Sequence, residues 1–263
     1  MHASSLRLYG CDGIPGRPVL NIYRRPSQMD LYLSPPCRPS TLDSFGNRRL
    51  LLRALKGSLS NFRGRLLDVG CGHQPYRSLL LSSPSQATDY IGLDLPDNLY
   101  QPPDLAWDGQ QIPLQNASVD SALLTEVLEH CPHPEAVLRE IARILKPGGF
   151  MFLTVPFIWP IHTVPHDEFR YTPFALRRLL ERAGFQNPII EATGGRHAVL
   201  ALTLGLWVRR RPLTSRVHVV TRAVLSILLW PVIWLLLKMD KRPPEFEEST
   251  MIVGLSAQAF KIR

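Results

Sequence analysis

The chain has 263 residues, of which 45% are hydrophobic and 20% charged, and its formal net charge is +8. This length suits one large domain or one domain with appendages, and the composition excludes a disordered or fibrous chain. Because no run of about 18 consecutive apolar residues occurs, we expect no standard membrane-spanning helix. Charged side chains interrupt the first 30 residues, so we expect no secretory signal and a cytoplasmic location.

The four cysteines lie far apart in the sequence and form no CxxC pair. This spacing favours a reducing compartment and indicates neither a disulfide framework nor a zinc site. We therefore expect no bound metal ion.

The positive charge lies at the two ends of the chain. Residues 1–65 carry a net charge of +8, residues 66–197 one of −6, and residues 198–263 one of +6. An acidic middle does not suit a phosphate backbone, so no nucleic-acid partner is expected. The basic flanks are consistent with contact to an anionic membrane surface, and equally with a solvated surface that has no partner.

The N-terminal part differs in character from the rest of the chain. Residues 1–40 contain six prolines and no apolar periodicity, so we expect a mostly irregular extension whose first 28 residues are dispensable. Residues 41–56 have apolar side chains on one side and arginines on the other, which predicts a helix ending at Gly57.

Strands and helices are expected to alternate in the middle of the chain. Short apolar runs predict four buried strands, at residues 66–69, 90–93, 121–125 and 150–155. Helices are expected to begin at Pro134 and after Thr172, and the first of them to end at the Pro-Gly-Gly of residues 147–149. This alternation predicts a doubly wound, mainly parallel sheet, with residues 251–260 as a closing strand.

A glycine turn follows the first of these strands. Gly70 and Gly72 suit a tight turn that lets a ligand approach the backbone at the carboxyl edge of the sheet. A dinucleotide fingerprint requires a third glycine three residues after Gly72, but that position is Pro75. This departure argues against NAD.

The order of the motifs resembles the Rossmann-like S-adenosylmethionine-dependent methyltransferases. The resemblance rests on LLDVGCG, then Asp94, Asp108-Gly109, Ser118-Val119-Asp120, TEVLEH and LREIARILKPGGFMFLTVP, and it covers about residues 60–195. It implies a seven-stranded sheet with an antiparallel last strand. It also implies a methyltransferase core over residues 41–196 that is completed by residues 246–263.

The resemblance assigns S-adenosylmethionine, a sulfonium cation with an amino acid end, a ribose and an adenine, as cofactor. The residues implied to bind it are Asp68, Gly70, Gly72, Asp94, Asp108 and Glu126. The first three receive the methionine end, and Asp94 accepts hydrogen bonds from the ribose. Asp108 meets the adenine, and Glu126 lies beside the methionyl group. A turn or capping role remains open for Asp94 and Asp108.

The segment Val155–Thr172 is expected to cap the acceptor, because it follows a buried strand at its carboxyl end and is rich in polar side chains. The candidates for acceptor binding are Asp167, Arg170 and Tyr171. The candidates for a general base are His130, His162 and His166, since neutral imidazole is available near pH 7. Each histidine is equally consistent with a structural role, and Asp167 and Arg170 with pairing to each other.

Residues 197–245 form an apolar and basic insertion, expected to be helical. Its longer uncharged run has 15 residues, about 22 Å as a helix, and contains Pro231, so crossing a bilayer is not expected. Flanking cations and three tryptophans favour a segment lying in a membrane interface. The alternative is a helix pair that packs on the sheet or covers the acceptor site.

The sequence therefore predicts a methyltransferase acting on a small-molecule or lipid-linked acceptor, peripheral to the cytoplasmic face of a membrane. The alternative is a scaffold protein that binds S-adenosylmethionine without turnover.

Overall fold

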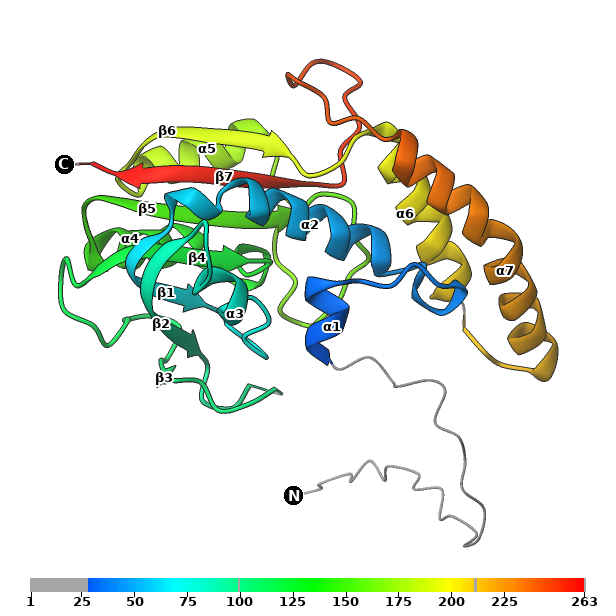
Figure 1. Cartoon of the computed structure of the whole chain (residues 1–263), viewed down its shortest axis with the longest axis horizontal. Helices are drawn as coiled ribbons and strands as arrows, with labels where there is room; N and C mark the ends of the chain where they lie inside the picture. Colours follow the sequence, from blue (N-terminus) through cyan, green and yellow to red (C-terminus); the bar gives the residue numbers. More distant parts are fainter. Residues whose placement is uncertain (1–27, 99, 211, 263) are drawn as a thin grey trace, which may run out of the picture.

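The computed structural model describes residues 28–98, 100–210 and 212–262. They form a seven-stranded sheet with helices on both faces and a helix pair at one end (Figure 1). The prediction of an irregular extension over residues 1–40 falls outside the described residues for residues 1–27. Within its remainder, Gln28–Leu33 form the helix α1, and Pro39–Thr41 the 3-10 turn η1.

The sheet confirms the predicted fold class. Its strands are β1 (Arg63–Val69), β2 (Gln86–Asp94), β3 (Leu105–Ala106), β4 (Val119–Thr125), β5 (Leu145–Pro156), β6 (Phe185–Ala192) and β7 (Gly254–Lys261). Their spatial order is β3-β2-β1-β4-β5-β7-β6. All neighbours pair in parallel except β7, which is antiparallel to both β5 and β6.

Helices cover both faces because apolar side chains alternate along the buried strands. The covering helices are α2 (Phe45–Gly57), α3 (Arg77–Leu80), α4 (Pro134–Ile144) and α5 (Pro173–Arg182). On β1, Leu66 belongs to the core cluster of α2 and α3, whereas its neighbour Leu67 belongs to that of α4 and α5. Both leucines are fully buried, so β1 is central to the fold.

One predicted boundary was wrong. Helix α4 ends at Ile144, and β5 begins at once with Leu145 rather than after the Pro-Gly-Gly sequence. Between β4 and β5 the register passes from Val119 opposite Leu145 to Ser121 opposite Phe150, which places residues 146–149 in a bulge. Gly148 there has φ +71°, a conformation that glycine adopts without strain.

The apolar insertion forms two helices, α6 (Arg196–Arg209) and α7 (Arg216–Met239). The length argument against a bilayer-spanning helix was wrong, because α7 continues through Pro231 and into its charged flanks for 24 residues. At about 1.5 Å per residue it is about 36 Å long. Among the described residues, α7 alone is long and apolar enough to cross a membrane by length and composition.

The helix pair is fastened to the N-terminal side of α2 and not to a face of the sheet (Figure 1). Helix α6 approaches closely at Gly205, where an added Cβ would lie 2.1 Å from the carbonyl oxygen of Leu42. Beyond the end of α7, the Asp240 carboxylate accepts from the N–H groups of Gly195 (3.1 Å) and Ala198 (2.9 Å) at the start of α6. These contacts hold α6 and α7 as one unit.

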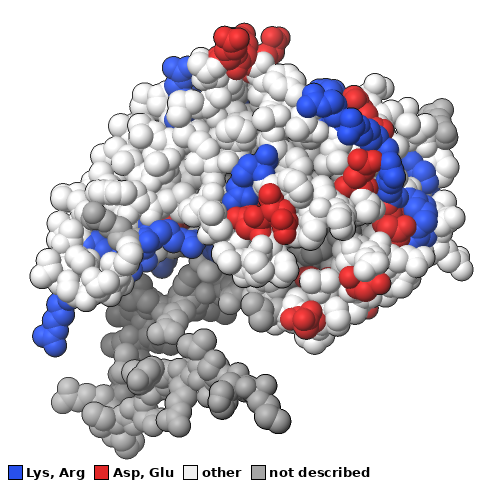
Figure 2. All heavy atoms as spheres, turned by 180° about the vertical axis from the view of Figure 1, so that it is seen from behind, with Lys and Arg blue, Asp and Glu red and all other residues white. Residues whose placement is uncertain are grey.

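Most of α7 faces outward. Its buried side chains are Ser226, Ile233 and Leu237, whereas the others are exposed or half-buried. Large apolar side chains are more than half exposed at Val220, Ile227 and Leu235. On the face shown in Figure 2, the end of the molecule built by α6 and α7 has few charged side chains, apart from basic ones at its tip.

Candidate active site

The glycine turn after β1 adopts a conformation that other residues resist. Gly70 has φ +70° and its N–H donates to the Leu93 carbonyl at 2.8 Å. A Cβ on Gly70 would lie 2.6 Å from Cγ2 of Val127, so the turn is pressed against the segment that follows β4. Gly72 has φ +51°, and its N–H donates to Oδ2 of Asp94 at 2.9 Å. The turn therefore depends on both glycines.

Asp68, the last but one residue of β1, is a buried carboxylate. Its Oδ2 accepts from the hydroxyl of Tyr90, and its Oδ1 has no partner among the described residues. Burial raises the pKa of Asp68 to about 7; the Tyr90 hydroxyl opposes this rise, and the nearby charge of Asp94 adds to it. A buried acceptor atom without a partner beside a glycine turn suits the ammonium group at the amino acid end of S-adenosylmethionine.

Asp94 and Asp108 both hold turns. At the end of β2, the Oδ1 atom of Asp94 accepts from the Leu95 N–H at 2.8 Å. Asp108 is exposed, and its Oδ1 accepts from the N–H groups of Gln110 (2.8 Å) and Gln111 (3.0 Å), which holds its pKa below the ordinary value. The turn role left open for these aspartates is thus present. Their contacts with ribose and adenine stay predictions.

Sequence reasoning missed Asp104. Its Oδ2 accepts from the Gly92 N–H at 2.8 Å, and the same carboxylate pairs with Arg77 at 3.2 Å. Asp104 therefore fastens the segment before β3 to β2 and α3 beside the glycine turn. No apolar periodicity or motif marks the residue, because its partners are distant in the sequence.

The segment after β4 carries two carboxyl groups with buried oxygens. Glu126 has φ +56°, and its Oε1 atom is buried without a partner among the described residues. Glu129, on the 3-10 turn η3 (Leu128–His130), is fully buried and neither carboxylate oxygen has a hydrogen-bond partner there. Burial raises the pKa of Glu126 to about 7, against the lowering effects of Thr154 and Arg170, and it raises that of Glu129 well above its ordinary value, with the charge of Glu126 adding to the rise.

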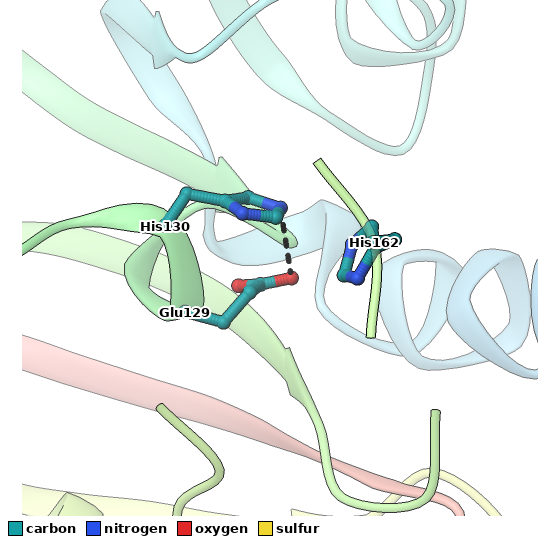
Figure 3. Close-up of side chains that lie close together, drawn as sticks. All are labelled: Glu129, His130 and His162. Carbon is teal, nitrogen blue, oxygen red and sulfur yellow. Dashed lines mark ion pairs between the residues drawn. The ribbon is translucent and has the colours of Figure 1, made fainter. Parts of the chain in front are cut away.

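His130 lies beside Glu129 with one ring nitrogen engaged and one available. Its Nδ1 is 2.7 Å from the carbonyl oxygen of His166, so the neutral ring places its hydrogen on Nδ1. Burial lowers the pKa of His130, and the neighbouring His162 adds to this effect. At neutral pH the Nε2 atom therefore carries a lone pair, and it lies 3.8 Å from Oε1 of Glu129 (Figure 3).

The acceptor segment is held by an ion pair. Arg170 donates to Asp167 through two nitrogens, at 2.7 and 2.8 Å, and Asp167 also accepts from the backbone N–H of His162 at 3.1 Å. The Arg170 guanidinium holds the pKa of Asp167 well below its usual range. Asp167 and Arg170 thus pair with each other, which was the alternative to acceptor binding.

The remaining candidates separate into three positions. His162 joins His130, with ring centroids 4.7 Å apart, whereas the imidazole of His166 is exposed and only its carbonyl takes part. Tyr171 was expected to bind the acceptor, but it is buried in the core and its hydroxyl donates to the Leu128 carbonyl at 3.0 Å. We correct its assignment to a residue that positions η3.

An open groove of about 520 Å³ lies between the acceptor segment and α6. It is lined by Phe157, Ile158, Trp159, Pro160, Arg170, Thr203, Leu206 and Trp207. Trp159 connects the groove to the histidines, since its ring centroid is 6.5 Å from that of His162. The lining is largely apolar, with Arg170 as its charged member.

Comparison with known proteins identifies the family. Residues 43–188 match the model of a methyltransferase domain, which is more than half of the chain, so the chain belongs to this family. The family and the Rossmann-like fold define an S-adenosylmethionine-dependent methyltransferase, with S-adenosylmethionine as cofactor. The buried Asp68 and the glycine turn fit that cofactor.

Individual relatives share part of the chain. A fatty-acid O-methyltransferase from Mycolicibacterium smegmatis is 31% identical over 129 residues, which are 45% of this chain and 46% of that protein. A ubiquinone biosynthesis O-methyltransferase from Xanthomonas oryzae pv. oryzae is 32% identical over 103 residues, 34% of this chain and 42% of that protein. The match thus spans less than half the length of each relative.

A solved structure shows the same fold. It is a methyltransferase from Thermotoga maritima, described as a possible histamine N-methyltransferase, with a TM-score of 0.51 and 16% identity. The similarity covers 81% of this chain and 88% of that one. At this identity it supports the fold and says nothing of the acceptor.

The raised pKa of Asp68 predicts how cofactor affinity depends on pH. A cation bound beside Asp68 favours its ionised form, so binding releases a proton below a pH of about 7, and S-adenosylmethionine affinity should rise about tenfold from pH 6 to 8. The free energy of unfolding of the free protein should change with pH in the opposite direction. The contribution of the Asp68 carboxyl to that free energy is lost as the pH rises from about 4 through 7. Calorimetric titration at several pH values measures the affinity.

The matched variant is Asp68→Asn, which keeps an acceptor for Tyr90 but cannot ionise. It should bind more weakly and lose this part of the pH dependence, whereas Glu126→Gln should keep it. An unchanged pH profile in folded Asp68→Asn protein would show that another group is responsible.

Proposed function

We propose that this methyltransferase transfers the methyl group of S-adenosylmethionine to a hydroxyl oxygen of an apolar, lipid-linked small molecule. The observation that carries this proposal is the position of the apolar groove, whose wall residue Trp159 lies beside His162 of the His130–His162 pair. The same segment that carries His130 packs on the cofactor turn through Val127. An acceptor lying in the groove would thus present its reactive end between the histidines and the methyl donor.

The relatives support the acceptor class and the acceptor atom. The two described above are named as O-methyltransferases of a fatty acid and of ubiquinone biosynthesis. Both names refer to molecules with long apolar parts, which agrees with a groove lined by aromatic and aliphatic side chains.

Bound S-adenosylmethionine supplies a methyl group already activated by its sulfonium leaving group. The protein therefore has to align the acceptor and exclude water from the reacting atoms. A hydroxyl acceptor must also lose its proton, and the Nε2 lone pair of His130 is available for that step. The contacts of Asp167 and Arg170 keep the acceptor segment in place for this alignment.

Radiolabelled S-adenosylmethionine tests the acceptor class directly. We expect label to move into fatty acids or quinol-type phenols with long chains, and far less into their short-chain analogues. Thr203→Trp should narrow the groove and lower kcat/KM by about tenfold or more, with cofactor affinity unchanged. Leu200→Trp, on an exposed part of the same helix, is the matched control.

Tight cofactor binding without transfer to any such acceptor would contradict the enzyme proposal and favour the scaffold alternative. Equal kcat/KM for the two tryptophan variants would show that the acceptor does not bind in the groove.

We also propose that the outward face of α7 rests on the anionic cytoplasmic face of a membrane. Val220, Ile227, Leu228 and Leu235 are 52–62% exposed on this helix, and Arg216 and Lys238 are exposed near its two ends. An amphiphilic surface with flanking cations matches the requirements of interfacial binding. Because α6 lines the groove and packs on α7, a lipid-linked acceptor could enter from that surface.

Vesicle flotation tests the location. Wild-type protein should float with anionic vesicles, more weakly with neutral ones, and partly less at high salt. Changing Val220, Ile227, Leu228 and Leu235 together to serine should lower the partition coefficient at least about tenfold, because apolar burial is lost. Phe174→Ser with Ile189→Ser, which are 58% and 56% exposed on α5 and β6, is the control.

Equal flotation of the quadruple variant and wild type would contradict the assignment to α7. Resistance of wild-type protein to alkaline extraction would indicate a spanning helix instead of a peripheral one.

A further inference from the structure

Three side chains of the site converge on one small space. Glu129, His130 and His162 each offer one ligand atom, and these atoms lie within 4.8 Å of one another. Figure 3 shows the carboxylate and the two imidazoles facing each other, two from η3 and one from the acceptor segment. They meet only through the fold, since more than 30 residues separate His130 from His162.

Both carboxylate oxygens of the fully buried Glu129 lack a hydrogen-bond partner among the described residues. The buried Nδ1 of His162 has no hydrogen bond there either, but it lies 3.3 Å from Oδ2 of Asp167. The 3.8 Å between Oε1 of Glu129 and Nε2 of His130 is too long for a hydrogen bond. A buried carboxyl group without a partner is either neutral or paired with a cation, and two imidazoles beside it suit a bound metal ion.

Glu126, Asp167 and Arg170 are the other charged groups near the cluster. Glu126, three residues before Glu129, adds a second carboxylate with a buried oxygen that has no partner among the described residues. The nearby cation, Arg170, is already engaged by both oxygens of Asp167. The charge of Arg170 also acts on Glu126 and Glu129, but both carboxyl groups keep a raised pKa, so this charge does not offset their burial.

We propose that Glu129, His130 and His162 bind a divalent metal ion of the zinc type. Two imidazole nitrogens with one carboxylate oxygen are a ligand set of catalytic zinc sites, which leave a further position open. The proposal departs from the expectation of no metal ion, which rested on the spacing of the cysteines alone. Cysteine takes no part in this ligand set.

Only a small movement would bring the three ligand atoms to an ion. Ligand atoms held about 2.1 Å from one ion lie about 3.4 Å apart, so side-chain rotations that move these atoms by about 1 Å suffice. The bond from His130 to the His166 carbonyl is the outer contact that a ligating histidine needs, because it fixes the hydrogen on Nδ1 and directs Nε2 to the ion.

The location gives the ion a role that rests on the proposed function. Val127 joins this segment to the cofactor turn, and Trp159 joins it to the groove. A cation between them lowers the pKa of an acceptor hydroxyl, whose proton passes to water. The oxygen then forms a bond to the methyl carbon as the carbon–sulfur bond breaks and its electron pair goes to sulfur. His130 would in this case act as a ligand and not as the base.

Metal titration of the full chain, stripped with a chelator, tests the site without any acceptor. Calorimetry with Zn²⁺ should show one site per chain. His162→Gln and Glu129→Gln should each weaken it by about tenfold or more. His166→Gln is the matched control: it lies on the same segment with an exposed ring, and its backbone carbonyl is retained.

S-adenosylmethionine affinity serves as the test of folding, and it should be unchanged in His162→Gln. Absence of a stoichiometric site for Zn²⁺ or Mn²⁺ in wild type, or equal affinity in His162→Gln and His166→Gln, would overturn the proposal. If Glu129→Gln weakens cofactor binding in a chain that binds no metal, the carboxylate instead faces the cofactor.

The two proposals fail separately. Metal binding without methyl transfer would leave the site standing and reject the proposed acceptor. Transfer that persists at full rate in the chelator-treated protein would reject the metal's role and leave the acceptor standing.

Discussion

The close approach of Gly70 to Val127 is the contact on which the rest of the site depends. It brings the turn after β1 against the segment after β4, and it leaves no room for a side chain at residue 70. The Leu93 carbonyl and the Asp94 carboxylate hold the same turn from β2. Three strands thereby meet at their carboxyl ends, where parallel sheets place their ligands.

The acceptor segment is attached to that arrangement by backbone groups of η3. The Glu129 carbonyl accepts from the N–H groups of Glu168 (2.7 Å) and Phe169 (3.2 Å), and the Leu128 carbonyl accepts from the Tyr171 hydroxyl. The ring of His130 adds a contact to the His166 carbonyl. A shift of the acceptor segment would therefore move the carboxylate and histidines as well, which couples acceptor position to the chemistry of the site.

The sequence predicted most of the fold because its signals are local. Apolar runs marked β1, β2, β4 and β5, and the order of the motifs implied the antiparallel last strand. The glycine turn was predicted for the same reason, since its φ values need glycine at residues 70 and 72. The continuity of α7 was missed because Pro231 and the charged ends conceal a helix that is stabilised by packing on α6.

The site could be predicted only in part, because its contacts join distant residues. His130 and His162 were recognised as candidates, but their convergence with Glu129 depends on how the acceptor segment folds back onto η3. Tyr171 resembled an acceptor ligand in a polar loop until the structure placed its hydroxyl on Leu128. No motif or apolar periodicity in the sequence marked Asp104.

We expect the methyl donor to lie between the Gly70 turn and the His130–His162 pair. A crystal structure of the complex with S-adenosylhomocysteine tests this placement. We expect the ribose hydroxyls within hydrogen-bond distance of Asp94, the amino acid end beside Asp68, and the sulfur facing the histidines. A product bound elsewhere, or with its sulfur turned away from the histidines and the groove, would contradict it.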